Sequence, residues 1–87
     1  MNDEERREYE LMLQRRRQDE DMAAVVRTPE GRRVLMSFLR RWGAGLPVGG
    51  TEAERTLRNE AEMLLSQIMR AAPQAGTEIL QDIYGGR

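Results

Sequence analysis

Apolar residues in the middle of the chain recur at the spacing of an α-helix. Between residues 29 and 42 they stand at i, i+1, i+4, i+5 and i+8, which places them on one helical face: Val34, Leu35, Phe38, Leu39 and Trp42. Thr28 is a favourable N-cap, and Pro29 suits the first helical position. Gly43 is placed to end the helix. The pattern therefore predicts a helix over 29–42 that is capped at both ends.

A second amphipathic stretch follows a glycine-rich segment. Residues 43–50 contain four glycines and one proline, which predicts a loop. Thr51 and Glu54 then form a capping box, which is typical of a helix start. The apolar stripe behind it comprises Leu57, Ala61, Leu64, Leu65 and Ile68. Pro73 predicts an end near residue 72, and the apolar residues that follow predict a short last helix over 77–84.

The N-terminal segment predicts a long helix with little apolar surface. Asn2 can cap it, acidic residues occupy its first turn, and neither glycine nor proline occurs before Pro29. Its first half carries only four apolar residues, Tyr9, Leu11, Met12 and Leu13. The arginines that follow, Arg15, Arg16 and Arg17, each precede an acidic residue by four positions and are expected to pair with it. A helix that is polar nearly all round projects into solvent or is ordered by a neighbouring subunit. We therefore interpret residues 1–19 as an arm, the alternative being a frayed tail.

These elements together predict an all-α fold, with a long N-terminal helical arm (1–19) and a small helical domain (20–87). The domain is a bundle of two main helices, 29–42 and 52–72, with short flanking helices at about 20–27 and 77–84. Its expected core comprises Val25, Val26, Val34, Leu35, Phe38, Leu39, Trp42, Leu57, Ala61, Leu64, Leu65, Ile68, Ile79, Leu80 and Ile83. A core of this size contributes only about 3–5 kcal/mol to the free energy of unfolding, so contacts with partner subunits would be a further source of stability.

The amino-acid composition excludes most catalytic mechanisms. The 87 residues include no cysteine and no histidine, and all 14 basic residues are arginine. Thiolate or imidazole metal sites, a histidine base, a Walker-A lysine and a Schiff-base lysine are therefore unavailable. We expect no enzymatic activity, no cofactor, no metal and no small-molecule substrate. The apolar runs are too short to span a membrane, and no secretory signal is visible, so we expect synthesis in the cytoplasm of the producing cell.

Charge divides the chain into three parts. Residues 1–26 carry five arginines and eight acids, residues 27–50 five arginines and one acid, and residues 51–87 four arginines and six acids. Four arginines of the basic middle flank the apolar face of the 29–42 helix: Arg32, Arg33, Arg40 and Arg41. Guanidinium groups bind phosphates and carboxylates bidentately, so nucleic acid, a protein partner and plain solvent all remain open for this stripe. We predict partner contacts for these four, for Arg15–Arg17, and for the apolar residues of the arm.

The string from Thr28 to Leu35, Thr-Pro-Glu-Gly-Arg-Arg-Val-Leu, resembles the signature of a family of small phage proteins. These proteins are encoded beside the portal gene of tailed, mostly short-tailed, bacteriophages, with a type example from a Bordetella phage. The resemblance covers about fifty residues, includes Arg58 and the Leu64-Leu65 pair, and leaves out the arm. Where the family often has a glycine in its second helix, this chain has Asn59 and Glu60. The shared Gly31 implies that another backbone approaches the first turn closely, since glycine otherwise costs a helix about 1 kcal/mol.

The resemblance implies a virion structural or assembly protein near the portal, in the head–tail region or the internal DNA-ejection apparatus. Such a protein would dock on the portal or on adjacent virion proteins, with a homo-oligomeric ring and contact with packaged DNA as open alternatives. It would be located in the virion after synthesis in the host. The alternative from another class is a small DNA-binding regulator or packaging adaptor, and an inhibitor of one host protein also remains open.

Overall fold

The computed structural model describes residues 2–47 and 49–85, which form α-helices and one π-helical turn. The helices are α1 (Asp3–Arg27), α2 (Pro29–Arg41), α3 (Glu52–Ala71) and α4 (Pro73–Leu80), and the turn is η1 (Gln81–Gly85). No strand occurs in these two ranges. The all-α prediction is confirmed, with the two main helices within one residue of their expected ends.

The three predicted N-caps hold their helices as expected. The Asn2 side chain accepts a hydrogen bond from the Glu5 amide at 2.7 Å. Thr28 Oγ1 accepts from the Gly31 amide at 3.0 Å, and Thr51 Oγ1 accepts from the Glu54 amide at 3.1 Å. Each cap satisfies a backbone donor that has no partner inside its own helix.

Two predicted boundaries differ from the structure. Residues 20–27 are the end of the single helix α1 and do not form a separate helix. The last helix begins at Pro73, four residues before the predicted start. Pro73 ends α3 as predicted, but its fixed φ also suits the first position of a new helix. A single non-helical residue, Ala72, therefore separates α3 from α4.

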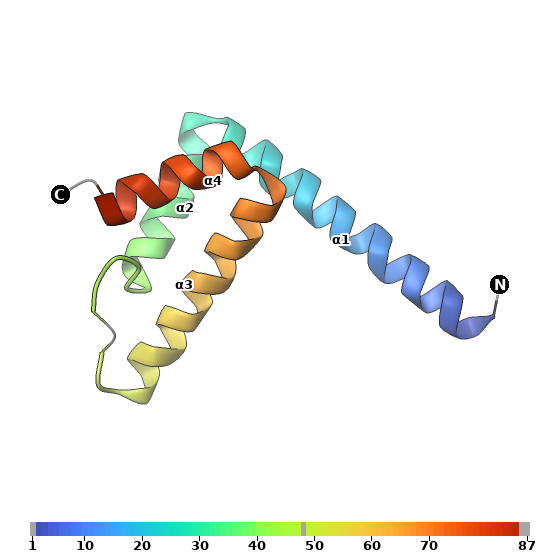
Figure 1. Ribbon diagram of the computed structural model, residues 1–87, viewed down its shortest axis with the longest axis horizontal. Helices are drawn as coiled ribbons and strands as arrows, with labels where there is room; N and C mark the ends of the chain where they lie inside the picture. The colour runs from blue at the N-terminus through green and yellow to red at the C-terminus, as the bar shows by residue number, and fades with distance from the viewer. Residues whose placement is uncertain (1, 48, 86–87) are drawn as a thin grey trace.

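Figure 1 shows α2 and α3 side by side, with α4 running from the end of α3 across α2 in this view and the first half of α1 projecting away from the rest. The molecule measures 52 × 32 × 17 Å along its principal axes. Since a helix with its side chains is about 10–12 Å across, the shortest dimension leaves room for at most two helical layers. The α2–α3 pair is consequently covered on one side only.

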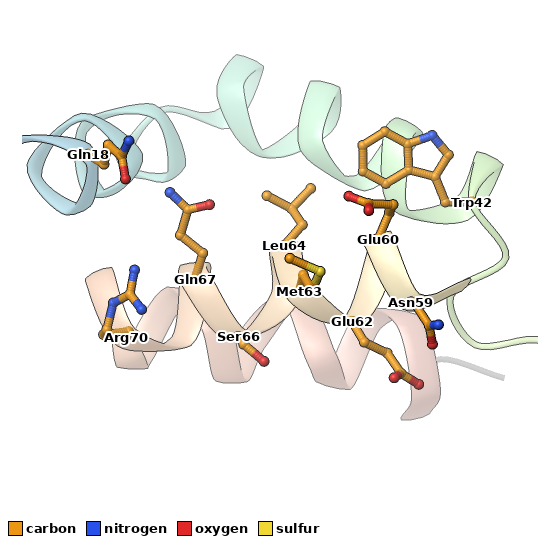
Figure 2. A pocket seen from close by; sticks show the side chains of 10 residues that line it. All are labelled: Gln18, Trp42, Asn59, Glu60, Glu62, Met63, Leu64, Ser66, Gln67 and Arg70. Atoms are coloured by element: carbon orange, nitrogen blue, oxygen red, sulfur yellow. The ribbon is translucent and has the colours of Figure 1, made fainter. Parts of the chain in front are cut away.

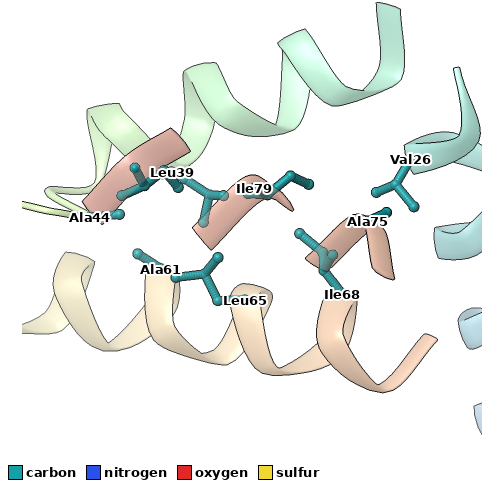
Figure 3. Close-up of a cluster of buried hydrophobic side chains, with 9 residues drawn as sticks. Val26, Leu39, Ala44, Ala61, Leu65, Ile68, Ala75 and Ile79 are labelled. Carbon is teal, nitrogen blue, oxygen red and sulfur yellow. The ribbon is translucent and has the colours of Figure 1, made fainter. Parts of the chain in front are cut away.

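The core forms where α4 and η1 pack between α2 and α3, as Figure 3 shows. Its members are Val26, Leu39, Ala44, Ala61, Leu65, Ile68, Ala75, Ile79 and Ile83. Four residues that we expected in the core are instead exposed: Val25, Val34, Phe38 and Leu57. The prediction was wrong for Val34 and Phe38 because the apolar face of α2 is wider than the surface that its neighbours cover. The buried Ala44 and Ala75 were missed because alanine carries little signal in an apolar pattern.

Gly31 lies where the sequence predicted a close approach. A Cβ atom at this position would stand 1.9 Å from the carbonyl oxygen of Val25 and 2.9 Å from Thr28 Oγ1. The last turn of α1 therefore occupies the space beside the first turn of α2. No side chain fits there without displacing backbone.

Candidate protein-docking surface

The arm is fully accessible along its length. Every residue from Asn2 to Gln18 is exposed, including Tyr9, Leu11, Met12 and Leu13. Tyr9, Met12 and Leu13 stand at i, i+3 and i+4 and share one face of α1, whereas Leu11 points to the other side. A row of exposed apolar side chains at this spacing is typical of a helix that binds a groove.

An ion pair fixes the base of the arm. Arg70 of α3 donates to both carboxylate oxygens of Asp19, through Nη2 at 2.9 Å and Nε at 3.1 Å. The hydrogen bonds and the charge of Asp19 raise the pKa of the Arg70 guanidinium above its ordinary value. Asp19 therefore pairs across the fold and not with Arg15, as the helical spacing predicted.

The four arginines of the predicted stripe differ in their contacts: one is internal, in that it bonds to other parts of the protein, and three are external, in that they are exposed. Arg32 is internal, because its Nε donates to the carbonyl oxygen of Val26 at 2.7 Å and its Nη1 lies 2.6 Å from Glu78 Oε2. It thus links the end of α1 to α2 and α4. Arg33, Arg40 and Arg41 are exposed on α2. Two donors of Arg32 therefore serve the fold, and partner contacts of the four arginines stay a prediction.

The exposed members have few contacts within the chain. Arg33 Nη2 lies 3.9 Å from Glu30 Oε1, at the limit of an ion pair. The Arg41 guanidinium carbon lies 5.5 Å from the centre of the Phe38 ring, within the range of a cation–π interaction. Both guanidinium groups are therefore available to a partner. The same holds for Arg15, Arg16 and Arg17, which are exposed on the arm.

A strip of apolar side chains crosses the uncovered side of α2 and α3. Phe38 and Trp42 stack with their ring centres 5.8 Å apart, and Val34, one turn before Phe38, is 54% exposed. Trp42 also borders a shallow groove of about 830 Å³ that Met63 and Leu64 line from α3. In Figure 2, Glu60, Leu64 and Gln67 point from α3 toward the gap that Trp42 borders on α2. We call Val34, Phe38, Arg41, Trp42, Met63 and Leu64 the α2–α3 face.

Arg58 has a structural role that the sequence analysis missed. Its side chain is only 15% exposed. Nη1 donates to the carbonyl oxygens of Gly43, at 2.7 Å, and of Leu46, and Nη2 lies 3.3 Å from the Tyr84 hydroxyl. Arg58 thereby holds the glycine-rich loop against α3 and η1. The bonds to two loop carbonyls leave no pattern in the sequence.

The described residues contain no group of three or more acidic, histidine or cysteine side chains that could hold a metal ion. Within residues 2–47 and 49–85, no helix is long and apolar enough to cross a membrane.

Comparisons with protein-family models, curated proteins and solved structures found no significant match.

Proposed function

We propose that this protein is a small, non-catalytic assembly protein that binds other proteins through its helices. The observation that carries the proposal is the arm, a rigid helix whose first 17 described residues are all exposed and include four large apolar side chains. Large apolar residues gathered on an exposed surface mark sites of protein interaction. The α2–α3 face adds a second such surface.

We further propose that the assembly is a bacteriophage virion, with the protein near the portal, in the head–tail region or the ejection apparatus. This step is supported by the resemblance of Thr28–Leu35 to small phage proteins encoded beside the portal gene. The close contact between Gly31 and Val25 supplies a physical reason for the glycine in that string. In this role the arm would contact portal or neighbouring virion proteins, and many copies around a ring would add weak contacts together.

Quantitative mass spectrometry of purified virions of the source phage tests this role. We expect the protein in virions at a copy number equal to that of the portal ring or a multiple of it. Absence from virions, together with abundance in infected cells, would contradict the virion role. Binding to DNA or to a host protein would then become the leading function.

DNA binding is the second candidate, and the exposure of Arg33, Arg40 and Arg41 on one helix favours it. The loop between α2 and α3 is longer than the three- or four-residue turn of a helix-turn-helix motif, which counts against that particular geometry. A gel shift in low salt, lost in Arg33→Ala/Arg40→Ala/Arg41→Ala and steeply weakened by added salt, would support this candidate.

A further inference from the structure

The arm and the α2–α3 face are two unpartnered surfaces of the same chain. We propose that the arm of one copy of this protein docks on the α2–α3 face of a second copy. This inference goes beyond the proposed function and does not depend on a phage origin. It rests on the apolar match, the order of charges and the direction of the arm.

The apolar match joins a row of three exposed side chains on the arm to a row of three on α2. Tyr9, Met12 and Leu13 form the row on the arm, and Val34, Phe38 and Trp42 form the row on α2. Helices that bind grooves use anchors at this i, i+3 and i+4 spacing. The exposed part of the arm is about 25 Å long and two helices side by side are about 20–24 Å across, so the arm is long enough to cross from α2 to α3.

The charges follow a complementary order on the two surfaces. Along the arm, residues 3–10 carry five acids and two arginines, the apolar row follows, and Arg15–Arg17 come last. Across the α2–α3 face, Arg41 lies on α2, the apolar strip follows, and Glu60 points from α3 toward the groove (Figure 2). The acidic end of an arm that crosses the face can therefore meet Arg41 of α2 while its basic end meets Glu60 of α3. Such an order also disfavours the reversed orientation.

The arm cannot reach the face of its own chain. α1 is one continuous helix, with Val26 in the core and Asp19 bonded to Arg70. Figure 1 shows its first half pointing away from α2 and α3. Folding the arm back would require breaking helix α1 on the N-terminal side of Asp19, so the arm that occupies the face comes from another copy. Because the arm and the face are different surfaces, the contact closes either by reciprocal exchange between two copies or as a ring.

The test measures the association of the full chain by sedimentation equilibrium, with circular dichroism to verify helix content. We expect the wild type to self-associate, and Met12→Glu on the arm and Val34→Glu on the face each to raise the dissociation constant about tenfold to a hundredfold. Gln14→Glu is the matched control, because it adds the same negative charge at an exposed position of α1 that lies on the other side of the helix from Met12. We expect this control to associate as the wild type does.

A mixing experiment identifies the two surfaces as partners. The Met12→Glu protein retains its face and the Val34→Glu protein retains its arm, so an equimolar mixture should form a one-to-one complex although each variant alone is monomeric. A monomeric wild type, equal effects of Gln14→Glu and Met12→Glu, or no complex in the mixture would each overturn the proposal. Disruption by Val34→Glu without any effect of Met12→Glu would indicate face-to-face contact and overturn it too. None of these results depends on the virion measurement, so the two proposals can fail separately.

Discussion

Arg70 forms a bidentate ion pair with Asp19, a residue 51 positions earlier in the chain. The pair joins α3 to α1 at the point where the arm leaves the body of the molecule. After Asp19, α1 contributes Met22 and Val26 to the apolar interior. Before Asp19, the side chains of α1 are exposed. The direction of the arm is therefore set by a contact on the surface as well as by the core.

Replacement of Arg70 with glutamine should loosen the base of the arm without unfolding the domain. Both partners lie at the surface, where water screens the pair, so the thermal midpoint should change little. Amide hydrogen exchange in residues 15–22 should become faster. Arg55→Gln, an exposed arginine on the same helix, is the control and should leave exchange in α1 unchanged. Equal exchange in both variants would show that the pair does not hold the arm.

The Gly31→Ala variant should be less stable than the wild type. In most helix interiors this substitution stabilises by about 0.5–1 kcal/mol. Here the new Cβ would meet the Val25 carbonyl oxygen, and we expect a loss of about 2–4 kcal/mol, with a larger loss for Gly31→Leu. Urea denaturation measures the difference. Gly50→Ala, where a Cβ meets nothing within 4 Å, is the control, and increased stability of Gly31→Ala would refute the close-contact account.

Replacement of Arg58 with methionine should destabilise the fold by about 1–2 kcal/mol, because two loop carbonyls lose their charged hydrogen-bond donor. Arg58→Lys should recover only part of this loss, since one ammonium group cannot reproduce the fork that contacts Gly43 and Tyr84. Urea denaturation gives the stability. Limited proteolysis should show faster cleavage in the loop that follows Gly43. Unchanged cleavage would mean that the loop is held by other contacts.

Arg32→Ala and Arg33→Ala should have different consequences although the residues are adjacent. Arg32 links Val26 and Glu78, and its loss should cost about 1–2 kcal/mol of unfolding free energy. Arg33 is exposed, and its loss should change stability by less than about 0.5 kcal/mol. Thermal denaturation compares the two variants. Similar losses in both would contradict the division of the stripe into internal and external arginines.

Leu39→Ala and Phe38→Ala compare the two sides of α2 directly. Leu39 is fully buried, and its truncation should lower the free energy of unfolding by about 2–5 kcal/mol. Phe38 is 38% exposed, so its truncation should cost less than Leu39→Ala despite the larger side chain. Urea denaturation of both variants gives the order. A larger loss for Phe38→Ala would mean that its side of α2 is covered in the folded protein.

Local features of the chain were predictable because they depend on residues a few positions apart. Asn2, Thr28 and Thr51 cap helices through bonds to amides three residues later, and the sequence alone identifies such pairs. The close contact at Gly31, which involves Val25 and Thr28, belongs to the same class. The exposure of the arm followed from its thin apolar content.

The direction from which neighbouring helices approach was not predictable. Val34 and Leu39 belong to the same apolar stripe, yet only Leu39 faces α4 and α3, because Pro73 starts α4 early and places it on one side of α2. Arg32 and Arg33 look alike in sequence, but only Arg32 reaches Glu78 across the fold.

The sequence by itself determined the helices, their caps and the long exposed arm, since these depend on backbone hydrogen bonds and periodicity within a few turns. Only the tertiary structure decided which apolar side chains remain uncovered and which arginines are free to bind, since burial depends on contacts between residues far apart in the chain.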